Sequence, residues 1–255
     1  MMSRFVVMAV AAAALGLVQP ASAADMPVKA YKAPVVAPAA SNWTGCYVGA
    51  GWGYGMLDDE RSTNDPTTFP ASTSAAKGWL GRFGGGCDYQ FNGSPIGPIV
   101  IGAFGDYDFM NITGNYGDPF NDTHYGTQTM RAAWYAGARA GVLVTPTLLT
   151  YISGGWTGGH INQIDILFAD GSPRGLYLPS QNLTGWFIGG GTEYALTMLP
   201  INGLFWKTEY RYASYGNYTQ NYIHSDGNPG TAAVNNDVAV QTVTTSLVWR
   251  FWSGH

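Results

Sequence analysis

The chain has 255 residues and a formal net charge of −4; only 11% of its residues are charged, 14% are aromatic and 35 are glycine. This acidic balance, without a basic cluster, argues against nucleic acid as a partner. Beyond the N-terminal segment no apolar run reaches 18 residues, which excludes an α-helical membrane span. The low content of charged residues then favours a β-protein whose surface contacts lipid.

The first 23 residues have the features of a secretory signal peptide. Arg4 precedes an apolar run at residues 5–18, and residues 21–23 form a cleavage site of the A-x-A type. Cleavage after Ala23 removes one of the 12 basic residues and leaves 11 against 16 acidic ones, a net charge of −5. Residues 24–42 contain three prolines among small side chains, which predicts a flexible tether in the periplasm.

From residue 43 onward, side chains alternate in character as they do along β-strands. Glycine occupies every second position from Gly49 to Gly55, a spacing that suits one face of a strand and disfavours a helix. A nucleotide-binding loop would need the spacing G-x-G-x-x-G followed by a helical pattern. We predict eight strands, at residues 43–57, 74–91, 99–111, 127–144, 148–160, 183–197, 203–213 and 237–251.

The connections between these strands alternate in length. Long polar loops are predicted at 58–73, 112–126, 161–182 and 214–236, and short turns at 92–98, 145–147 and 198–202. This sorting is typical of outer-membrane barrels, whereas a lipocalin-like barrel does not require it and an immunoglobulin-type sandwich needs Greek-key crossings. The predicted fold class is all-β, an eight-stranded antiparallel up-and-down transmembrane β-barrel at 43–251 with a C-terminal extension at 252–255. Because the tether starts in the periplasm, we expect the long loops to face outside.

The strand faces indicate which side of the wall meets lipid. Trp79 and Phe83 share one face of strand 74–91, while Arg82 and Asp88 share the other, and Asp108 is assigned to the same charged face in strand 99–111. The glycines belong to the charged face, so we expect a polar interior with lipid-facing aromatic residues. An eight-stranded barrel has room inside only for side chains, and buried charges need partners. The expected interior network, for which the glycines of the first strand would leave room, consists of Arg82, Asp106, Arg139, Glu193, Lys207, Glu209 and Arg211.

Five segments together resemble the small outer-membrane β-barrel proteins of alphaproteobacteria. These proteins are often labelled porin family or outer-membrane β-barrel domain proteins, and they share the fold of the outer membrane protein A barrel. The resemblance covers Asp25 to Phe251. It rests on the segments DMPVKAYKAP, WTGCYVGAGWGYG, GDYDF, GWFIGGGTEYAL and KTEYRYASYG.

The chain departs from the family pattern at several positions, and the resemblance also implies a C-terminal assembly signal. Phe104 stands where family members often have an inward acid, and Gly141 where they have a second arginine, so a thinner charge network is expected. Family members usually have an aromatic residue at the position of Cys46 and an aliphatic one at that of Cys87. A terminal Phe is read by the barrel-assembly machinery; here the alternating residues that would form this signal are Leu247, Trp249 and Phe251.

Cys46 and Cys87 are the two cysteines of the chain. Both are predicted on the lipid-facing side of adjacent strands near the periplasmic rim, and export would deliver them to an oxidising compartment. Two outcomes stay open at this point. Either they form a disulfide, or a register offset separates them and each is a small apolar residue facing lipid.

We predict no metal site, no cofactor and no enzymatic activity. The four histidines, at 124, 160, 224 and 255, fall in predicted loops or tails without the spacing of metal ligands. Residues 58–60 (DDE) are interpreted as a solvated loop that bridges lipopolysaccharide through divalent ions. Barrel-embedded enzymes need a Ser/His or Asp/His pair at the outer rim, and only His160, with Asp165 five residues away, lies near a strand end.

The sequence therefore favours a structural outer-membrane protein of a Gram-negative bacterium that maintains the envelope and displays surface loops. One alternative is a narrow porin, although an interior filled with side chains argues against much flux. The other is a surface receptor for a ligand such as haem, because some relatives are described as binding haem; His124, His160 or His224 would be the iron ligands. The expected partners are outer-membrane lipid, lipopolysaccharide and the barrel-assembly machinery.

Overall fold

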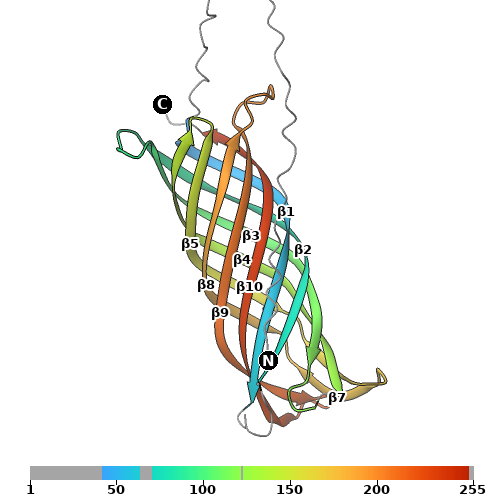
Figure 1. Ribbon diagram of the computed structural model, residues 1–255. Coiled ribbons are helices and arrows are strands. Elements are labelled where there is room, and N and C mark those ends of the chain that lie inside the picture. Colours follow the sequence, from blue (N-terminus) through green and yellow to red (C-terminus); the bar gives the residue numbers. More distant parts are fainter. Residues whose placement is uncertain (1–41, 64–70, 122, 253–255) are drawn as a thin grey trace, which may run out of the picture. The chain divides into compact units, whose positions relative to one another are not determined.

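One antiparallel sheet closes on itself in the computed structural model, which describes residues 42–63, 71–121 and 123–252. The predicted signal peptide, nearly all of the tether and residues 253–255 of the C-terminal extension lie outside the described residues. Figure 1 shows the strands winding obliquely round the barrel. The ring consists of β10 (Pro229–Trp252), β1 (Gly45–Thr63), β2 (Ser72–Phe91), β3 (Ile99–Gly117), β4 (His124–Thr145), β5 (Leu148–Ile161), β8 (Gln181–Ala195) and β9 (Leu204–His224), which pairs back with β10.

The predicted eight-stranded antiparallel barrel is thereby confirmed. Its short connections, at 92–98, 146–147 and 196–203, also agree with the sequence prediction to within two residues. Within the described ranges, the structure contains no helix with the length and apolarity needed to cross a bilayer.

The predicted long loops are wrong in extent, because most of their residues continue the strands. β1 runs to Thr63 and β3 to Gly117, and the connection between β9 and β10 shrinks to residues 225–228. The segment 161–182 contains two further strands, β6 (Ile164–Phe168) and β7 (Pro173–Leu178). β6 pairs with β4 and β7 pairs with β9, so the sheet closes a second time at this end. We call residues 58–63, 72–77, 111–121, 123–131, 161–182 and 214–241 the collar.

An apolar belt surrounds the barrel between the collar and the short turns. Trp156 is 73% exposed and Trp79 67%, a degree of exposure that large apolar side chains rarely have in water. None of the described side chains that point outward in this belt is charged. Toward the collar the belt ends at a ring of polar outward residues, which we call the polar border: Asp58, Lys77, Asn111, Arg131, His160, Asn182, Ser214 and Gln241.

Three inward glycines of β1, Gly49, Gly51 and Gly53, make room for the neighbouring strand β10, and Gly55 makes room for Ile112; this corrects the expectation that they make room for arginines. A methyl group at Gly51 would overlap the carbonyl oxygen of Thr245 and the hydroxyl of Ser246 on β10. The glycines that accommodate charged side chains lie on other strands. Gly84 lies against Asp106, Gly102 against Asp88 and Gly189 against Arg211.

The turn between β9 and β10 is short and internally bonded. The carboxylate of Asp226 accepts hydrogen bonds from the backbone N–H of Asn228 (3.0 Å) and from its Nδ2 (2.8 Å), and these bonds lower the pKa of Asp226. The turn at residues 92–98 occupies the opposite end of the barrel.

An epitope inserted after Asp226 should be accessible to antibody on intact cells, because the exported chain is expected to start in the periplasm, so that β1 runs outward and the collar at its far end would face outside. The same epitope inserted after Gly93 serves as the matched control and should be detected only in permeabilised cells. Detection in the reverse pattern would invert this orientation.

Candidate functional site: the barrel interior

Four charged residues form a cluster toward the short-turn end of the interior. The Arg139 guanidinium donates from Nε and Nη2 to the Asp88 carboxylate at 2.9 and 2.5 Å, and from Nη1 to Glu193 Oε2 at 2.9 Å. Arg250 Nη2 lies 2.9 Å from Glu193 Oε1 and 2.7 Å from Asp88 Oδ2. Two arginines and two carboxylates therefore neutralise one another.

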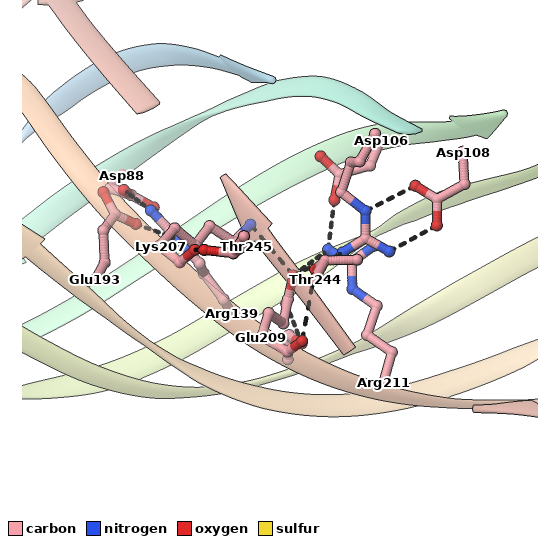
Figure 2. A network of polar contacts seen from close by, with 12 residues as sticks. Asp88, Asp106, Asp108, Arg139, Glu193, Lys207, Glu209, Arg211, Thr244 and Thr245 are labelled. Atoms are coloured by element: carbon pink, nitrogen blue, oxygen red, sulfur yellow. Dashed lines mark hydrogen bonds and ion pairs between the residues drawn. The ribbon is translucent and has the colours of Figure 1, made fainter. Parts of the chain in front are cut away.

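A second cluster lies further along the interior toward the collar. Arg82 makes a two-pronged contact with Asp108, with both distances at 2.7 Å, and donates from Nη1 to Glu209 Oε2 at 3.1 Å. Glu209 also accepts from Arg211 Nη2 at 2.7 Å and lies 3.3 Å from Lys207 Nζ. Arg211 bonds Asp106 as well. Figure 2 shows Asp88 and Glu193 at one end of the combined network and Asp106 and Asp108 at the other.

Aromatic rings line the spaces between these charges. The Arg211 guanidinium lies 4.8 Å from the ring centre of Tyr135 and 5.0 Å from that of Phe104. Phe104 also lies 5.8 Å from the Lys207 ammonium. The residue that replaces an expected inward acid thus supplies a ring face, which attracts cations through its quadrupole.

All seven residues predicted for the interior network lie in these two clusters. Sequence reasoning left out Asp88 and Asp108, although it assigned both to the charged face, and it missed Arg250 altogether. The signal for Arg250 was the same alternation, because it stands between the outward residues Trp249 and Phe251. With these additions, five basic and five acidic side chains balance: Arg82, Arg139, Lys207, Arg211 and Arg250 against Asp88, Asp106, Asp108, Glu193 and Glu209.

Trp43 fills the mouth of the barrel at the short-turn end. It is fully buried, and its ring centre lies 4.8 Å from that of Phe205. Its carbonyl oxygen accepts a hydrogen bond from Arg250 Nη1 at 3.0 Å. Residue 43 was predicted to begin the first strand, but it precedes β1 and folds inward instead.

The collar has an interior of its own, which sequence reasoning missed. Asp118 accepts hydrogen bonds from the Tyr222 hydroxyl at 3.0 Å and from Arg174 Nη1 at 2.9 Å, and its Oδ2 lies 3.3 Å from His124 Nδ1. The Tyr222 hydroxyl also lies 3.2 Å from that of Tyr116. Around them a second hydrophobic cluster is formed by Tyr116, Ile164, Ile166, Leu178, Tyr222 and Val234.

Residues 58–60 lie in β1, which corrects their interpretation as a solvated loop with a bridged cation. Asp58 and Glu60 point outward, whereas Asp59 is buried and lies 3.1 Å from Arg61 Nε. Arg61 also donates to the Gly117 carbonyl at 2.6 Å. The carboxylates therefore do not converge, and no group of three His, Cys, Asp or Glu side chains in the described part of the chain is placed to hold a metal ion.

The candidate histidines are separated around the barrel. His124 is buried at the start of β4, His160 lies at the end of β5 with its Nδ1 2.7 Å from Asn182 Oδ1, and His224 ends β9. Asp165 lies in β6, and its carboxylate accepts a hydrogen bond from Gln163. In the described residues His160 and Asp165 thus bond different partners.

Cys46 and Cys87 stand directly opposite each other in the β1–β2 register. A disulfide joins them, with their Cα atoms 4.0 Å apart. The bond lies at the short-turn end of the belt, close to the end of β2 at Phe91. Leu247 and Trp249 of the expected assembly signal point outward on β10, as does Phe251.

The fold and its interior define a transmembrane β-barrel of the outer-membrane type, apolar outside and charged inside. The chain belongs to the family described as the outer membrane protein beta-barrel domain, whose sequence profile matches residues 9–251. It is accordingly a protein of the Gram-negative cell outer membrane.

Solved structures of several outer-membrane proteins are similar to this chain. Neisserial surface protein A shares 14% identity over 82% of this chain and 98% of its own, with a TM-score of 0.37. OprG from Pseudomonas aeruginosa shares 10% over 83% and 99%, with a TM-score of 0.41. The outer membrane protease OmpT from Escherichia coli shares 11% over 81% and 97%, with a TM-score of 0.40. No curated protein sequence matches the chain.

Replacing Glu209 with Gln should destabilise the barrel by about 3–5 kcal/mol, because it removes one partner of a buried charge cluster and leaves Arg82, Lys207 and Arg211 under-compensated. Urea unfolding in lipid vesicles, followed by tryptophan fluorescence, measures the free energy. The matched control is Glu60→Gln, an exposed carboxylate on β1 that should change stability by less than about 0.5 kcal/mol. Equal effects of the two substitutions would refute the role of the cluster.

Alkylation of the unreduced protein should add no label to Cys46 or Cys87, and mass spectrometry reads the result. Their replacement by Ser together should lower stability by about 4 kcal/mol, because the bond closes a loop with a sequence separation of 41. Two alkyl adducts on the unreduced chain would show that the bond does not form in the envelope.

Proposed function

We propose that the protein is a structural barrel that maintains the outer membrane and presents its collar as a rigid surface. The observation that carries the proposal is an interior filled at three heights. Trp43 and Phe205 occupy the mouth at the short turns, the balanced charge clusters occupy the middle, and the tyrosines and aliphatic residues around Asp118 occupy the collar. Paired charges and packed rings hold the wall together and leave little room for solutes.

Two features support this reading at a finer level. The five segments that resemble alphaproteobacterial barrels favour a place among those proteins, whose outward terminal residues are read by the assembly machinery. In the described residues, His160 is engaged by Asn182 and has no serine partner, which supports a non-enzymatic role.

A narrow porin and a haem receptor are the competing functions. A porin needs a continuous aqueous path, and the paired charges along the interior oppose it. A haem receptor based on paired histidine ligation would need two imidazoles on one side of an iron site, whereas His124 is buried against Asp118 and His160 and His224 lie on the separate strands β5 and β9. For these reasons we propose neither the porin nor the haem receptor as the function.

The purified protein should give no stable conductance steps in planar lipid bilayers, because its interior is filled. The double substitution Arg82→Ala with Asp108→Ala removes a neutral pair from the middle of the interior and should produce small steps, which serves as the positive control for insertion. Steady conductance by the unsubstituted protein would favour the porin, and a Soret shift on titration with haem would favour the receptor.

A further inference from the structure

A groove of about 550 Å³ lies in the exterior wall where β3, β4, β5 and β8 meet the polar border. Its floor is low at Ala132, whose outward side chain is small, whereas the Trp134 indole covers Gly158. Tyr107 and Trp134 stand on its belt side, and Arg131 and His160 belong to the border. Its lining thus passes from aromatic and apolar to polar across the level at which lipid head groups begin.

A β-bulge directs Arg131 into this position. In the belt part of β4 odd-numbered residues such as Ala133 lie inside the barrel, whereas in its collar part even-numbered residues such as Gln128 do, and the exposed Arg131 stands where the alternation changes. The pairing of β4 with β5 shifts between Met130 and Ala132, so Arg131 is the extra residue. Bulges commonly redirect a side chain at the cost of a regular ladder.

The Arg131 guanidinium has no acidic partner among the described ion pairs. Its contact is a 3.0 Å hydrogen bond from Nη1 to Asn111 Oδ1, and none of the described Asp or Glu side chains lies within 4.0 Å. In the described chain, Lys77 is the other basic residue on the polar border, and it does not line the groove. An exposed guanidinium above an apolar floor is complementary to an anion that carries an apolar tail.

Neighbouring polar groups add hydrogen-bonding capacity. His160 Nδ1 is paired with Asn182 Oδ1 at 2.7 Å, which fixes both side chains and leaves the imidazole Nε2 and the amide Nδ2 without described protein partners. Thr184 lines the same side of the groove. Hydroxyl and amide groups of a sugar can pair with such atoms, and its ring can stack on Trp134 or Tyr107.

We propose that this groove binds lipid A, the phosphorylated glycolipid of lipopolysaccharide, with a phosphate on Arg131, the sugar beside His160 and Asn182, and an acyl chain along the apolar floor. The inference rests on the proposed orientation, in which the collar and its border face the outer leaflet. A bilayer phospholipid would satisfy the phosphate contact but not the sugar contacts, so lipid A is the occupant that uses the whole lining.

Native mass spectrometry of the full chain, purified from outer membranes and stripped of lipid with detergent, tests the proposal. Bisphosphorylated lipid A should bind with one molecule per chain. Lipid A without phosphates, phosphatidylglycerol and inorganic phosphate should each bind about tenfold more weakly or not at all, because each lacks part of the contact set.

Two matched pairs of variants locate the site. Arg131→Gln should weaken lipid A binding about tenfold, whereas Lys77→Gln, which removes the other border cation, should leave it unchanged. Ala132→Trp should fill the floor and abolish binding with the charge intact, whereas Ala138→Trp, an outward alanine deeper in the belt, should not. Each variant is first shown to fold by its different mobility on gels when boiled and unboiled.

Equal losses in the Arg131 and Lys77 variants, or equal binding of lipid A and phosphatidylglycerol, would overturn the proposal in favour of general attraction to anionic lipid. Absence of lipid A binding in a folded protein would also overturn it. These results would leave the structural role intact, whereas a chain that is recovered from the soluble periplasm without a boiling-dependent mobility would overturn the proposed function itself.

Discussion

The narrow closure of eight strands governs the rest of the structure. A barrel of this size holds only side chains, so every charged group that points inward needs a counterion there. Glycines on β2 and β3 make space for the carboxylates of Asp106 and Asp88, and rings such as Phe104 and Tyr135 occupy the space beside the guanidinium groups. Because the interior has little space, most large apolar side chains of the belt lie on the outer wall, where they contact lipid.

The sequence predicted the belt well because the two faces of the wall meet different surroundings there. Trp79 and Arg82 differ in character since one meets lipid and the other meets charges. In the collar the outer face is polar and the inner face mixes charged residues with apolar ones, so that Asp58 outside and Asp59 inside are the same residue type and the alternation weakens. The collar strands, the cluster around Asp118 and the continuation of β9 could not be recovered from periodicity for this physical reason.

The collar changes what the protein displays. Four long loops would offer adaptable surfaces, whereas the observed extension is a second sheet closure with its own core, tied together by Asp118, Tyr222 and Arg174. Among the described residues its rim includes strand ends and the short turn 225–228, which is held by bonds between Asp226 and Asn228. In the proposed orientation a partner outside the cell would meet a surface backed by this packed core, which lowers the ordering cost of binding.

The charge balance of the interior is complete only when the last strand, which carries Arg250, is in place. Asp88, Glu193 and Arg139 alone carry an excess negative charge, and Arg250 on the last strand neutralises it while bonding the carbonyl of Trp43, which lies 207 residues earlier in the chain. A polypeptide cut short before β10 would lack both the closing strand and this counterion. The interior of such a truncated chain would stay hydrated, and its first strand would lack a partner. Truncated chains would therefore fail to become compact, and this difference would distinguish them from complete ones in the envelope.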